Sequence, residues 1–510
     1  MSALRCAAGL AACLLLGGGT VGPNFEHPAS WWSLSSWFAK ETAETPPAPS
    51  EPVTEPFDPH WWTIFKDPQL TALEDQLVAA NLDVRVADIR LAEAREEVGI
   101  AAAAALPQVD ANAAYTHQQQ SRTGVLALAP AHSSQTPGTA TNGLGGRSGG
   151  LPTGGLYRPY DLFQYGFDAA WELDLWGRVR RSVESAGAQV NASEEFERDT
   201  LVTASAELAR DYVSLRGTQL QLQITRDNLE INRQSLRLTQ ERASGGVTTD
   251  LDVAQAAAQV ESVASLIPDL EASEAQFINA ISLLVGKEPR ALEVELAAPR
   301  PIPPVPPRVP VGLPSELARR RPDVRQAEAQ LHAATADVGV AVADFYPRFT
   351  IGASGAMQGL KIHNLWQADA ASYSFGPSVT LPIFQGGRLT RTLELREAQQ
   401  QEAAINYQRT VLNALHDVDN ALTAYDQEQR RRDRLEQAVV QNRRALDLAR
   451  QRYEQGVSDF LQVLIVQRDL LAAQQALAIS TTTVSTDLVQ LYKALGGGWE
   501  ADLPENNPSL

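Results

Sequence analysis

The residue types that most often do chemistry in proteins are few in this chain, and their spacing matches no catalytic or metal-binding pattern. Two cysteines occur, Cys6 and Cys13, both near the N-terminus, which excludes a disulfide framework and a cysteine-rich metal site. The seven histidines are scattered without a metal-ligand spacing. A GxSxG string at 146–150 lies in a glycine-rich stretch, without the strand and helix that flank a nucleophile elbow. We therefore predict no enzyme activity, no cofactor and no bound metal.

Two segments, 242–251 and 452–461, align with each other at a spacing of 210 residues and are typical of turns between two helices. Gly246 and Gly456 suit the left-handed position that ends a helix. The hydroxyl residues after them suit the N-cap of the next helix, and the acids that follow favour its first turn: Thr248, Thr249 and Asp250 in one segment, Ser458 and Asp459 in the other. Helix-turn chemistry alone would explain all of these residues, and this interpretation stays open beside a functional one.

Composition and charge exclude further classes. The chain has 510 residues, of which 43 are basic and 61 acidic, and its net charge of −18 argues against a nucleic-acid partner. Arg5 followed by the apolar stretch 7–16 indicates an export signal over residues 1–19. No later run of 18 apolar residues occurs, so we predict no membrane-spanning helix in the mature chain. The periplasm, the exterior or a β-barrel membrane remain as destinations.

The chain contains an internal duplication. The tripeptide at 83–85 recurs 240 positions later at 323–325, and Gly246-Val247 recurs 210 positions later as Gly456-Val457. A flexible Gly/Ser/Thr/Pro-rich loop over 118–158 in the first half explains why the spacing between equivalent positions falls from 240 to 210 residues. We predict six segments in this order: the signal, an extended segment over 20–60, a first repeat over 61–298, an extended proline-rich linker over 299–314, a second repeat over 315–498 and a tail over 499–510.

Helical periodicity dominates both repeats. Leucines stand at intervals of seven at 201, 208, 215, 222, 229 and 236, which is typical of coiled-coil packing. We predict long helices over 176–242 and 387–455, each followed by a shorter helix, over 248–286 and 457–496. About 65 residues at 1.5 Å each would form a rod of about 100 Å.

Four segments change to a period of two: 108–117, 162–173, 348–357 and 373–383. Each has about ten residues, the length of a tilted membrane-spanning strand. The predicted lipid-facing residues are Phe163, Tyr165, Phe167, Trp171, Phe349, Ile351, Tyr373, Phe375 and Val379. Four strands of a soluble sheet are the alternative. Because membrane barrels start at about eight strands, spanning strands would require several chains to share one barrel, as a dimer or a trimer.

Three strings resemble the outer membrane factor (TolC-like) family of tripartite efflux systems, especially its NodT/OprM-like branch. They are VGPNFEHP at 21–28, WWTIFKDPQL at 61–70 and GLPSELARRRPDVRQAE at 312–328. The resemblance implies an α+β membrane protein, a homotrimer in the outer membrane of a Gram-negative bacterium. Its twelve-stranded transmembrane β-barrel would continue as a twelve-helix periplasmic α-barrel with a mixed equatorial region.

The resemblance also implies a function and partners. Such proteins are passive exit ducts for small molecules such as drugs. They work with an inner-membrane resistance-nodulation-division pump and a periplasmic adaptor, also called a membrane fusion protein. Two alternatives stay open. One is a protein-secretion duct paired with an ABC exporter, and the other is a soluble periplasmic coiled-coil scaffold, which would leave the aromatic alternation at 163–173 and 373–383 unexplained.

By the same resemblance, the two turns would close the tunnel and dock the adaptor. Leu461 and Leu464 match positions that line the closed end in relatives, where three copies would form rings that exclude water. Gln462 and Ile465 stand where relatives often carry aspartates, so we predict a mainly apolar gate. The complete prediction assigns the gate to Leu461, Leu464, Asp459 and Asp250, and adaptor docking to Gly246, Val247, Gly456, Val457 and Ser458.

One departure from the branch concerns lipid attachment. Relatives usually carry a cysteine immediately before Thr-Val-Gly-Pro, but this chain has Gly19 there. Cys13 ends a lipobox-like string, so we name it as the candidate for lipidation, with palmitate as one of the acyl chains. The apolar core before it is short for a signal peptide, which a misassigned start codon would also explain. A single acyl chain adds only marginal membrane binding, so the barrel would hold the protein with or without it.

Overall fold

The computed structural model describes residues 19–27, 50–53, 60–119, 159–310 and 320–498. Residues 1–18 of the predicted export signal, including Cys13, lie outside these residues, as do most of the predicted loop over 118–158 and the predicted tail. The chain divides into two compact units. One comprises Met1–Asn24, Val98–Glu184 and Ala336–Arg396, and the other comprises Phe25–Glu97, Ser185–Thr335 and Glu397–Leu510. Each unit contains parts of both repeats, so the duplication does not divide the chain into two compact halves.

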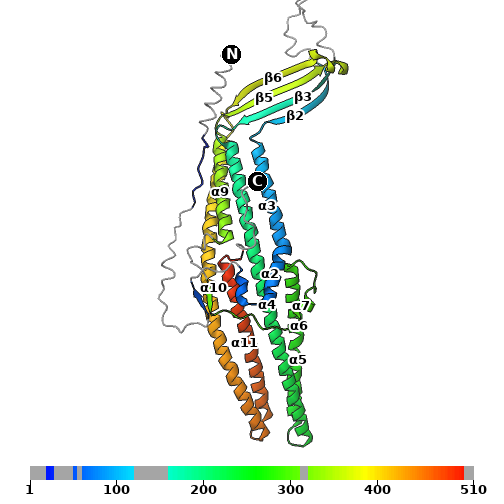
Figure 1. Cartoon of the computed structure of the whole chain (residues 1–510), viewed down its shortest axis with the longest axis vertical. Helices are drawn as coiled ribbons and strands as arrows, with labels where there is room; N and C mark the ends of the chain where they lie inside the picture. Colours follow the sequence, from blue (N-terminus) through cyan, green and yellow to red (C-terminus); the bar gives the residue numbers. More distant parts are fainter. Residues whose placement is uncertain (1–18, 28–49, 54–59, 120–158, 311–319, 499–510) are drawn as a thin grey trace, which may run out of the picture. The chain divides into compact units, whose positions relative to one another are not determined.

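The first unit contains a four-stranded antiparallel sheet (Figure 1). Its strands are β2 (Gln108–Gln118), β3 (Tyr160–Leu173), β5 (Arg348–Gly359) and β6 (Ala371–Thr380), in that order across the sheet. The short helices η6 (Ile362–Trp366) and η7 (Ala368–Ala370) connect β5 to β6. The fourth strand ends at Thr380 and not at the predicted residue 383, because Thr380 pairs with Arg348, the first residue of its only partner strand in the described sheet, β5.

The register of the sheet separates apolar from polar side chains. Phe167 pairs with Gly355, which pairs with Tyr373, so these residues share one face. Because side chains alternate along each strand, all nine residues predicted to face lipid lie on this same face. The opposite face carries Ser354 and Ser374, whose hydroxyls are 2.8 Å apart. On the apolar face Tyr373 is 91% exposed and Phe375 is 76% exposed within the single chain.

Helices form most of the second unit. Besides η6 and η7, the helices of the described residues are, in chain order, η2 (Trp61–Phe65), α2 (Pro68–Ala80), α3 (Leu82–Ala103), α4 (Arg178–Ser244), α5 (Asp250–Ala264), α6 (Leu266–Leu284), α7 (Glu293–Leu296), α9 (Pro322–Ala343), α10 (Arg388–Glu454) and α11 (Phe460–Ala494). A small parallel pair, β1 (Glu51–Val53) with β4 (Arg308–Pro310), accompanies them. Within the described ranges, no helix combines the length and the apolarity needed to cross a membrane.

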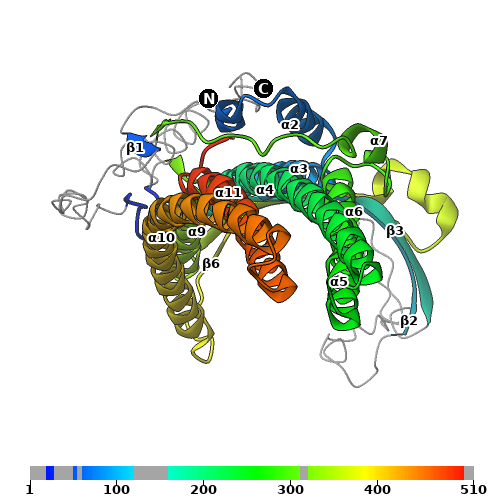
Figure 2. The same cartoon turned by 90° about the horizontal axis from the view of Figure 1, so that it is seen from below.

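Two helical hairpins carry the repeat. The first hairpin is α4 with α5 and α6, and the second hairpin is α10 with α11 (Figures 1 and 2). The single helix predicted over 248–286 is wrong: two helices occupy it, with a break at Ser265. Pro268 explains the break, because its nitrogen has no hydrogen to bond the carbonyl of Ala264. In contrast, α11 continues without interruption for 35 residues.

The leucines at intervals of seven form part of the core that joins the hairpins. Those at 201, 208, 215, 222 and 229 are all buried. At one end of the core the ring of Trp61 stacks on that of Tyr492, with centroids 5.4 Å apart. The buried face of α4 therefore follows the repeat of seven residues, as expected for knobs-into-holes packing.

Arg216 of α4 is completely buried and holds three parts of the second unit together. Its guanidinium donates to the Oε1 of Gln69 at 2.6 Å and to the carbonyl oxygens of Leu296 and Ala298 at 3.2 and 3.0 Å. It also lies 4.8 Å from the ring centre of Tyr212. The charge is thus stabilised by oxygen acceptors from α2 and from the end of α7, and by an aromatic face.

Glu197 of α4 is buried and hydrogen-bonds with Asp88 of α3. Burial, and next the bond with Asp88, raise the pKa of Glu197 from 4.5 to about 7. The folded chain therefore holds this proton more tightly than the unfolded chain does. The contribution of this proton to the free energy of unfolding is fully present below about pH 4.5 and is lost as the pH rises through about 7.

Glu197→Gln is therefore expected to reduce the loss of stability between pH 5 and pH 8. We expect this loss to become smaller by on the order of 1 kcal/mol. The value is below the free energy that corresponds to the full pKa shift, because partial access of water screens the interaction. Melting curves at both pH values measure the effect, with Glu207→Gln at an exposed site of the same helix as the control. Equal pH dependence in Glu197→Gln and the parent would contradict the assignment.

Candidate functional site

The turn at the end of the first hairpin is a Schellman motif followed by a capping box. The N–H of Val247 donates to the carbonyl of Arg242 at 2.9 Å, and Gly246 has a φ of +69°. Thr249 is the N-cap of α5, and its side chain and that of Asp252 each bond the other's backbone N–H. The bond from the Thr248 hydroxyl is the largest of the effects that lower the pKa of Asp252.

The predicted residues of this first turn therefore lie where the sequence places them, with one addition. Asp250 is exposed in the first turn of α5, and Val247 is 73% exposed. Asp252 was not among the predicted residues, although the spacing of Thr249 and Asp252 matches the signature of a capping box.

The turn at the end of the second hairpin repeats the helix ending but not the cap. The N–H of Val457 donates to the carbonyl of Arg452 at 2.9 Å, and Gly456 has a φ of +72°. The N-cap of α11 is Asp459 and not Ser458, and its side chain makes no capping hydrogen bond. The prediction of Ser458 as N-cap is therefore wrong, because the extended residue that begins the helix lies one position later.

The two leucines predicted to form the gate lie in different surroundings. Leu461 is 50% exposed in the first turn of α11. Leu464 is 9% exposed, in a cluster with Val439 and Tyr453 of α10 and Phe460 of α11. Val457 and Leu461 are exposed in the second hairpin just as their repeat equivalents Val247 and Leu251 are exposed in the first.

Arg242 joins the two turns. Its guanidinium donates to the carbonyl oxygens of Tyr453 at 3.1 Å and Glu454 at 3.3 Å. It also lies 4.5 Å from the ring centre of Tyr453. Carbonyls at the end of a helix lack helical partners, so this cation from the first hairpin stabilises the end of α10. Sequence reasoning missed Arg242 as a contact because its partners are more than 200 residues away.

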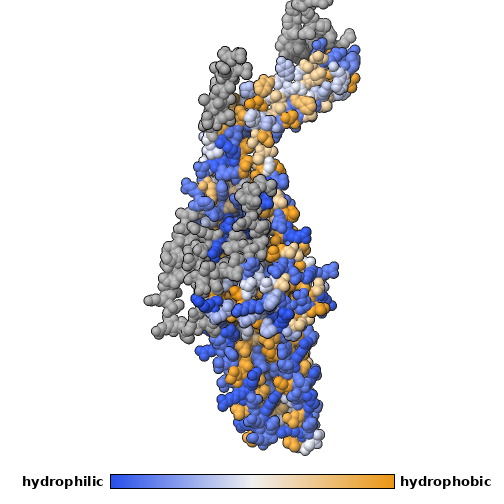
Figure 3. All heavy atoms as spheres, in the orientation of Figure 1, coloured by the Kyte–Doolittle hydropathy of each residue, from blue (hydrophilic) through white to orange (hydrophobic). Residues whose placement is uncertain are grey.

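Hydrogen bonds continue between α4 and α11 away from the turns. The amide nitrogen of Gln467 donates to the hydroxyl of Ser235 at 2.9 Å, and that of Asn228 donates to Gln474 at 3.0 Å. Leu471 adds apolar packing against α4 and α5. Figure 3 shows hydrophilic side chains over much of the visible surface of the hairpins, with apolar residues between them. The contact between the hairpins thus combines polar and apolar groups, while the interior of the second hairpin is mainly apolar.

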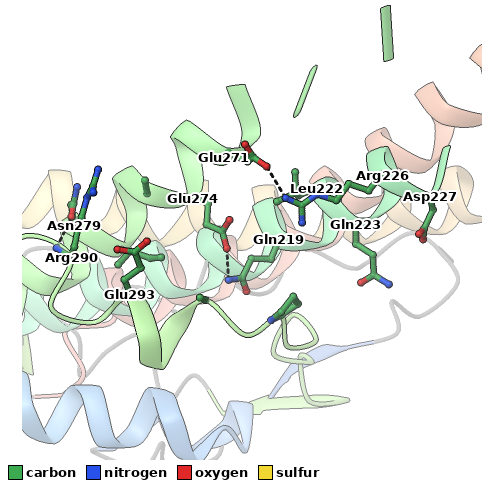
Figure 4. Close-up of a pocket in the computed structure, with 14 residues that line it drawn as sticks. Gln219, Leu222, Gln223, Arg226, Asp227, Glu271, Glu274, Asn279, Arg290 and Glu293 are labelled. Carbon is green, nitrogen blue, oxygen red and sulfur yellow. Dashed lines mark hydrogen bonds and ion pairs between the residues drawn. The ribbon is translucent and has the colours of Figure 1, made fainter. Parts of the chain in front are cut away.

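A separate cavity of about 560 Å³ lies between α4, α6 and the segment that contains α7 (Figure 4). Two polar contacts join α4 to α6 in its lining. Arg226 pairs with Glu271 at 2.7 Å, and Gln219 donates to Glu274 at 2.8 Å. Sequence reasoning did not single out this cavity, because its lining comes from three segments without a shared motif.

Comparison with known proteins identifies the class of this chain. The sequence profile described as Outer membrane efflux protein matches residues 73–287 and 313–497, which include both turns. The chain belongs to the outer membrane efflux protein family. It is an outer membrane efflux channel, as the resemblance predicted, and its function is transport.

Relatives of this family match almost the whole chain. The solvent efflux pump outer membrane protein SrpC of Pseudomonas putida is 30% identical over 497 residues, covering 96% of this chain and 97% of the relative. The pyoverdine export outer membrane protein OpmQ of Pseudomonas aeruginosa is 31% identical over 500 residues, covering 97% of each. Among solved structures, the outer-membrane channel OprN has a TM-score of 0.80 at 32% identity, covering 94% of this chain and all of that one. The open MtrE channel of Neisseria gonorrhoeae has a TM-score of 0.72 at 27% identity, covering 94% and 99%.

Proposed function

We propose that three copies of this chain form one passive exit duct through the outer membrane. The observation that carries the proposal is an open sheet with one apolar face in a chain of the efflux family. Within the described residues, the outer edges of β2 and β6 have no strand partner. Lipid cannot form hydrogen bonds with the unpaired backbone groups of such edges, so a sheet that spans the membrane must close into a barrel. Three copies would supply twelve strands, with the aromatic face toward lipid and the polar face toward the lumen.

The cargo in this proposal is small molecules. Relatives that match nearly the full length are named for solvent efflux and pyoverdine export, which favours small-molecule efflux over protein secretion. An inner-membrane resistance-nodulation-division pump would supply the energy, and a periplasmic adaptor would join the pump to the duct. We assign adaptor docking to the two turns, where Val247 and Val457 are exposed beside Gly246, Gly456 and Ser458.

The gate in this proposal is at the second turn. Leu461 would form the apolar ring that excludes water, with Leu464 packed behind it in the hairpin. Asp459 and Asp250 are both exposed and would give the periplasmic mouth a negative charge. The Arg242 contacts with the end of α10 would hold the two hairpins together in the closed state.

The test is the detergent-corrected mass of the protein extracted from isolated outer membranes. We expect about three times the 55.2 kDa chain, and discrete conductance steps when the same material is added to planar lipid bilayers. A soluble periplasmic monomer, or a membrane species with the mass of two chains, would contradict the shared barrel of twelve strands.

A further inference from the structure

In each repeat, one side chain near the start of the repeat donates a hydrogen bond to the carbonyl at the end of its hairpin. The two side chains occupy equivalent positions. Asn81, just before α3, donates from Nδ2 to the carbonyl of Leu284, the last residue of α6, at 2.8 Å. Arg321, just before α9, donates from Nη1 to the carbonyl of Ala494, the last residue of α11, at 3.0 Å. The offsets between these pairs, 240 and 210 residues, are those that relate the two repeats. Asn81 and Arg321 are therefore equivalent, and we call their contacts the first and second latch.

The glycines after the two carbonyls support this equivalence. Gly286 and Gly496 both have a positive φ, of +67° and +71°. A Cβ on Gly496 would lie 2.8 Å from the Cγ of Arg321, and one on Gly286 would lie 2.7 Å from the carbonyl oxygen of Ala80. Only glycine allows the helix end to approach its latch this closely in either repeat.

The two latches differ in charge and in the number of helices they join. Asn81 is neutral, and its Oδ1 accepts from backbone N–H groups at the start of its own helix, α3. The guanidinium of Arg321 also binds both carboxylate oxygens of Asp323 in α9, at 3.0 and 2.8 Å. It reaches Asp417 of α10 at 3.2 Å. One nearly buried cation thus joins α9, α10 and α11, whereas the side chain of Asn81 joins α3 to α6.

The unbroken length of α11 means that the second latch can influence the position of the distant turn. Because α11 has 35 residues and no break, it is a rod of about 52 Å from Ala494 to the turn. By the same geometry, a rotation of about 6° at its fixed end would move the turn by about 5 Å. The first hairpin has no unbroken helix of this length beside α4, because its second arm is interrupted at Ser265. A small change in the orientation of α11 at Ala494 would therefore produce a large displacement of Leu461.

We propose that Arg321 is a positioning residue for the gate. The second latch holds the end of the second hairpin that lies away from its turn, at the angle that keeps the gate closed. When the duct opens, the hairpin rotates about this point, while the hydrogen bonds between α4 and α11 exchange with water. This inference rests on the gate proposed above at the second turn.

The experiment compares resting single-channel conductance in planar bilayers for the full-length protein and three variants. Arg321→Asn installs the residue of the first latch and is expected to raise the resting conductance several-fold. Asp417→Asn removes only the negative charge that Arg321 meets on α10 and is expected to give a smaller rise. Asn81→Ala, which removes the first latch, is the matched control and should leave the conductance at the parental value. Melting curves of all four proteins accompany the recordings, because a purely structural role would lower stability without opening the channel.

Two outcomes would overturn the inference. One is parental conductance in Asp417→Asn together with parental conductance or failed assembly in Arg321→Asn. The other is an equal rise in Asn81→Ala and Arg321→Asn. Leu461→Ser in the same assay distinguishes failure of the latch from failure of the gate. A rise in Leu461→Ser with none in the latch variants rejects only the latch, whereas no rise in any of them rejects the gate at the second turn as well.

Discussion

Leu461→Ser is expected to raise the resting single-channel conductance several-fold without a large loss of stability. Leu461 is half exposed in the first turn of α11, so its side chain contributes little to the packing of its own chain. In a trimer three copies would surround one axis, and an apolar ring of this kind blocks conduction by excluding water. Serine is smaller and binds water, so the ring would become wider and hydrated. Recordings in planar bilayers at fixed salt measure the change.

Two leucines serve as controls for this prediction. Leu251→Ser changes the exposed repeat equivalent in the first hairpin and is expected to leave the conductance unchanged. Leu464→Ser removes a buried side chain from the cluster with Val439 and Tyr453, so it is expected to destabilise the turn by about 2–5 kcal/mol as well as opening it. Parental conductance in Leu461→Ser would show that the tunnel does not close at this residue.

Arg216→Ala is expected to lower the free energy of unfolding by more than about 3 kcal/mol. The substitution takes their donor from the carbonyl of Ala298 and from the Oε1 of Gln219. It also removes one of two donors from the carbonyl of Leu296, which keeps Gln219, and from the Oε1 of Gln69, which keeps the longer bond from Tyr212. Each such group costs about 1–3 kcal/mol when it is unsatisfied, and the packing against the ring of Tyr212 is also lost. Thermal or urea unfolding in detergent measures the effect.

Arg226→Ala is the matched control for Arg216→Ala. Arg226 lies on the same helix, but its side chain is 55% exposed and pairs with the equally accessible Glu271. Such surface pairs contribute about 0–1 kcal/mol, so the melting temperature should change little. Equal losses in the two variants would mean that the buried hydrogen bonds of Arg216 contribute no more than a surface ion pair.

Local periodicity explains how much of the fold the sequence predicts. A helix that buries one face must repeat its apolar residues, and the leucines of α4 at intervals of seven are buried accordingly. A sheet with one apolar face must alternate, and the alternation predicts which side chains of β3, β5 and β6 share a face. The helix ending at Gly246 and Gly456 is equally local, because a left-handed residue is a property of a few neighbouring positions.

Other features depend on contacts between distant residues and leave no local pattern. The bonds of Arg242 with the end of α10 and of Arg216 with the end of α7 join parts of the chain that only the fold brings together. The burial of Leu464 beside an exposed Leu461 depends on where α10 packs. The break at Ser265 belongs to a different class, because Pro268 is a readable local signal that the prediction of one continuous helix overlooked.

The strict separation of the two faces of the sheet also limits how this chain can change in length. One residue inserted within β3 would move every later side chain of the strand to the opposite face, exchanging aromatic for polar groups in the part of the register with β5 that follows the insertion. Insertions in the connections between strands carry no such penalty. The extra 30 residues of the first repeat fall in this kind of place, in the sequence between β2 and β3. Additions and deletions are therefore expected to accumulate between strands during divergence, while the length of each strand stays constant.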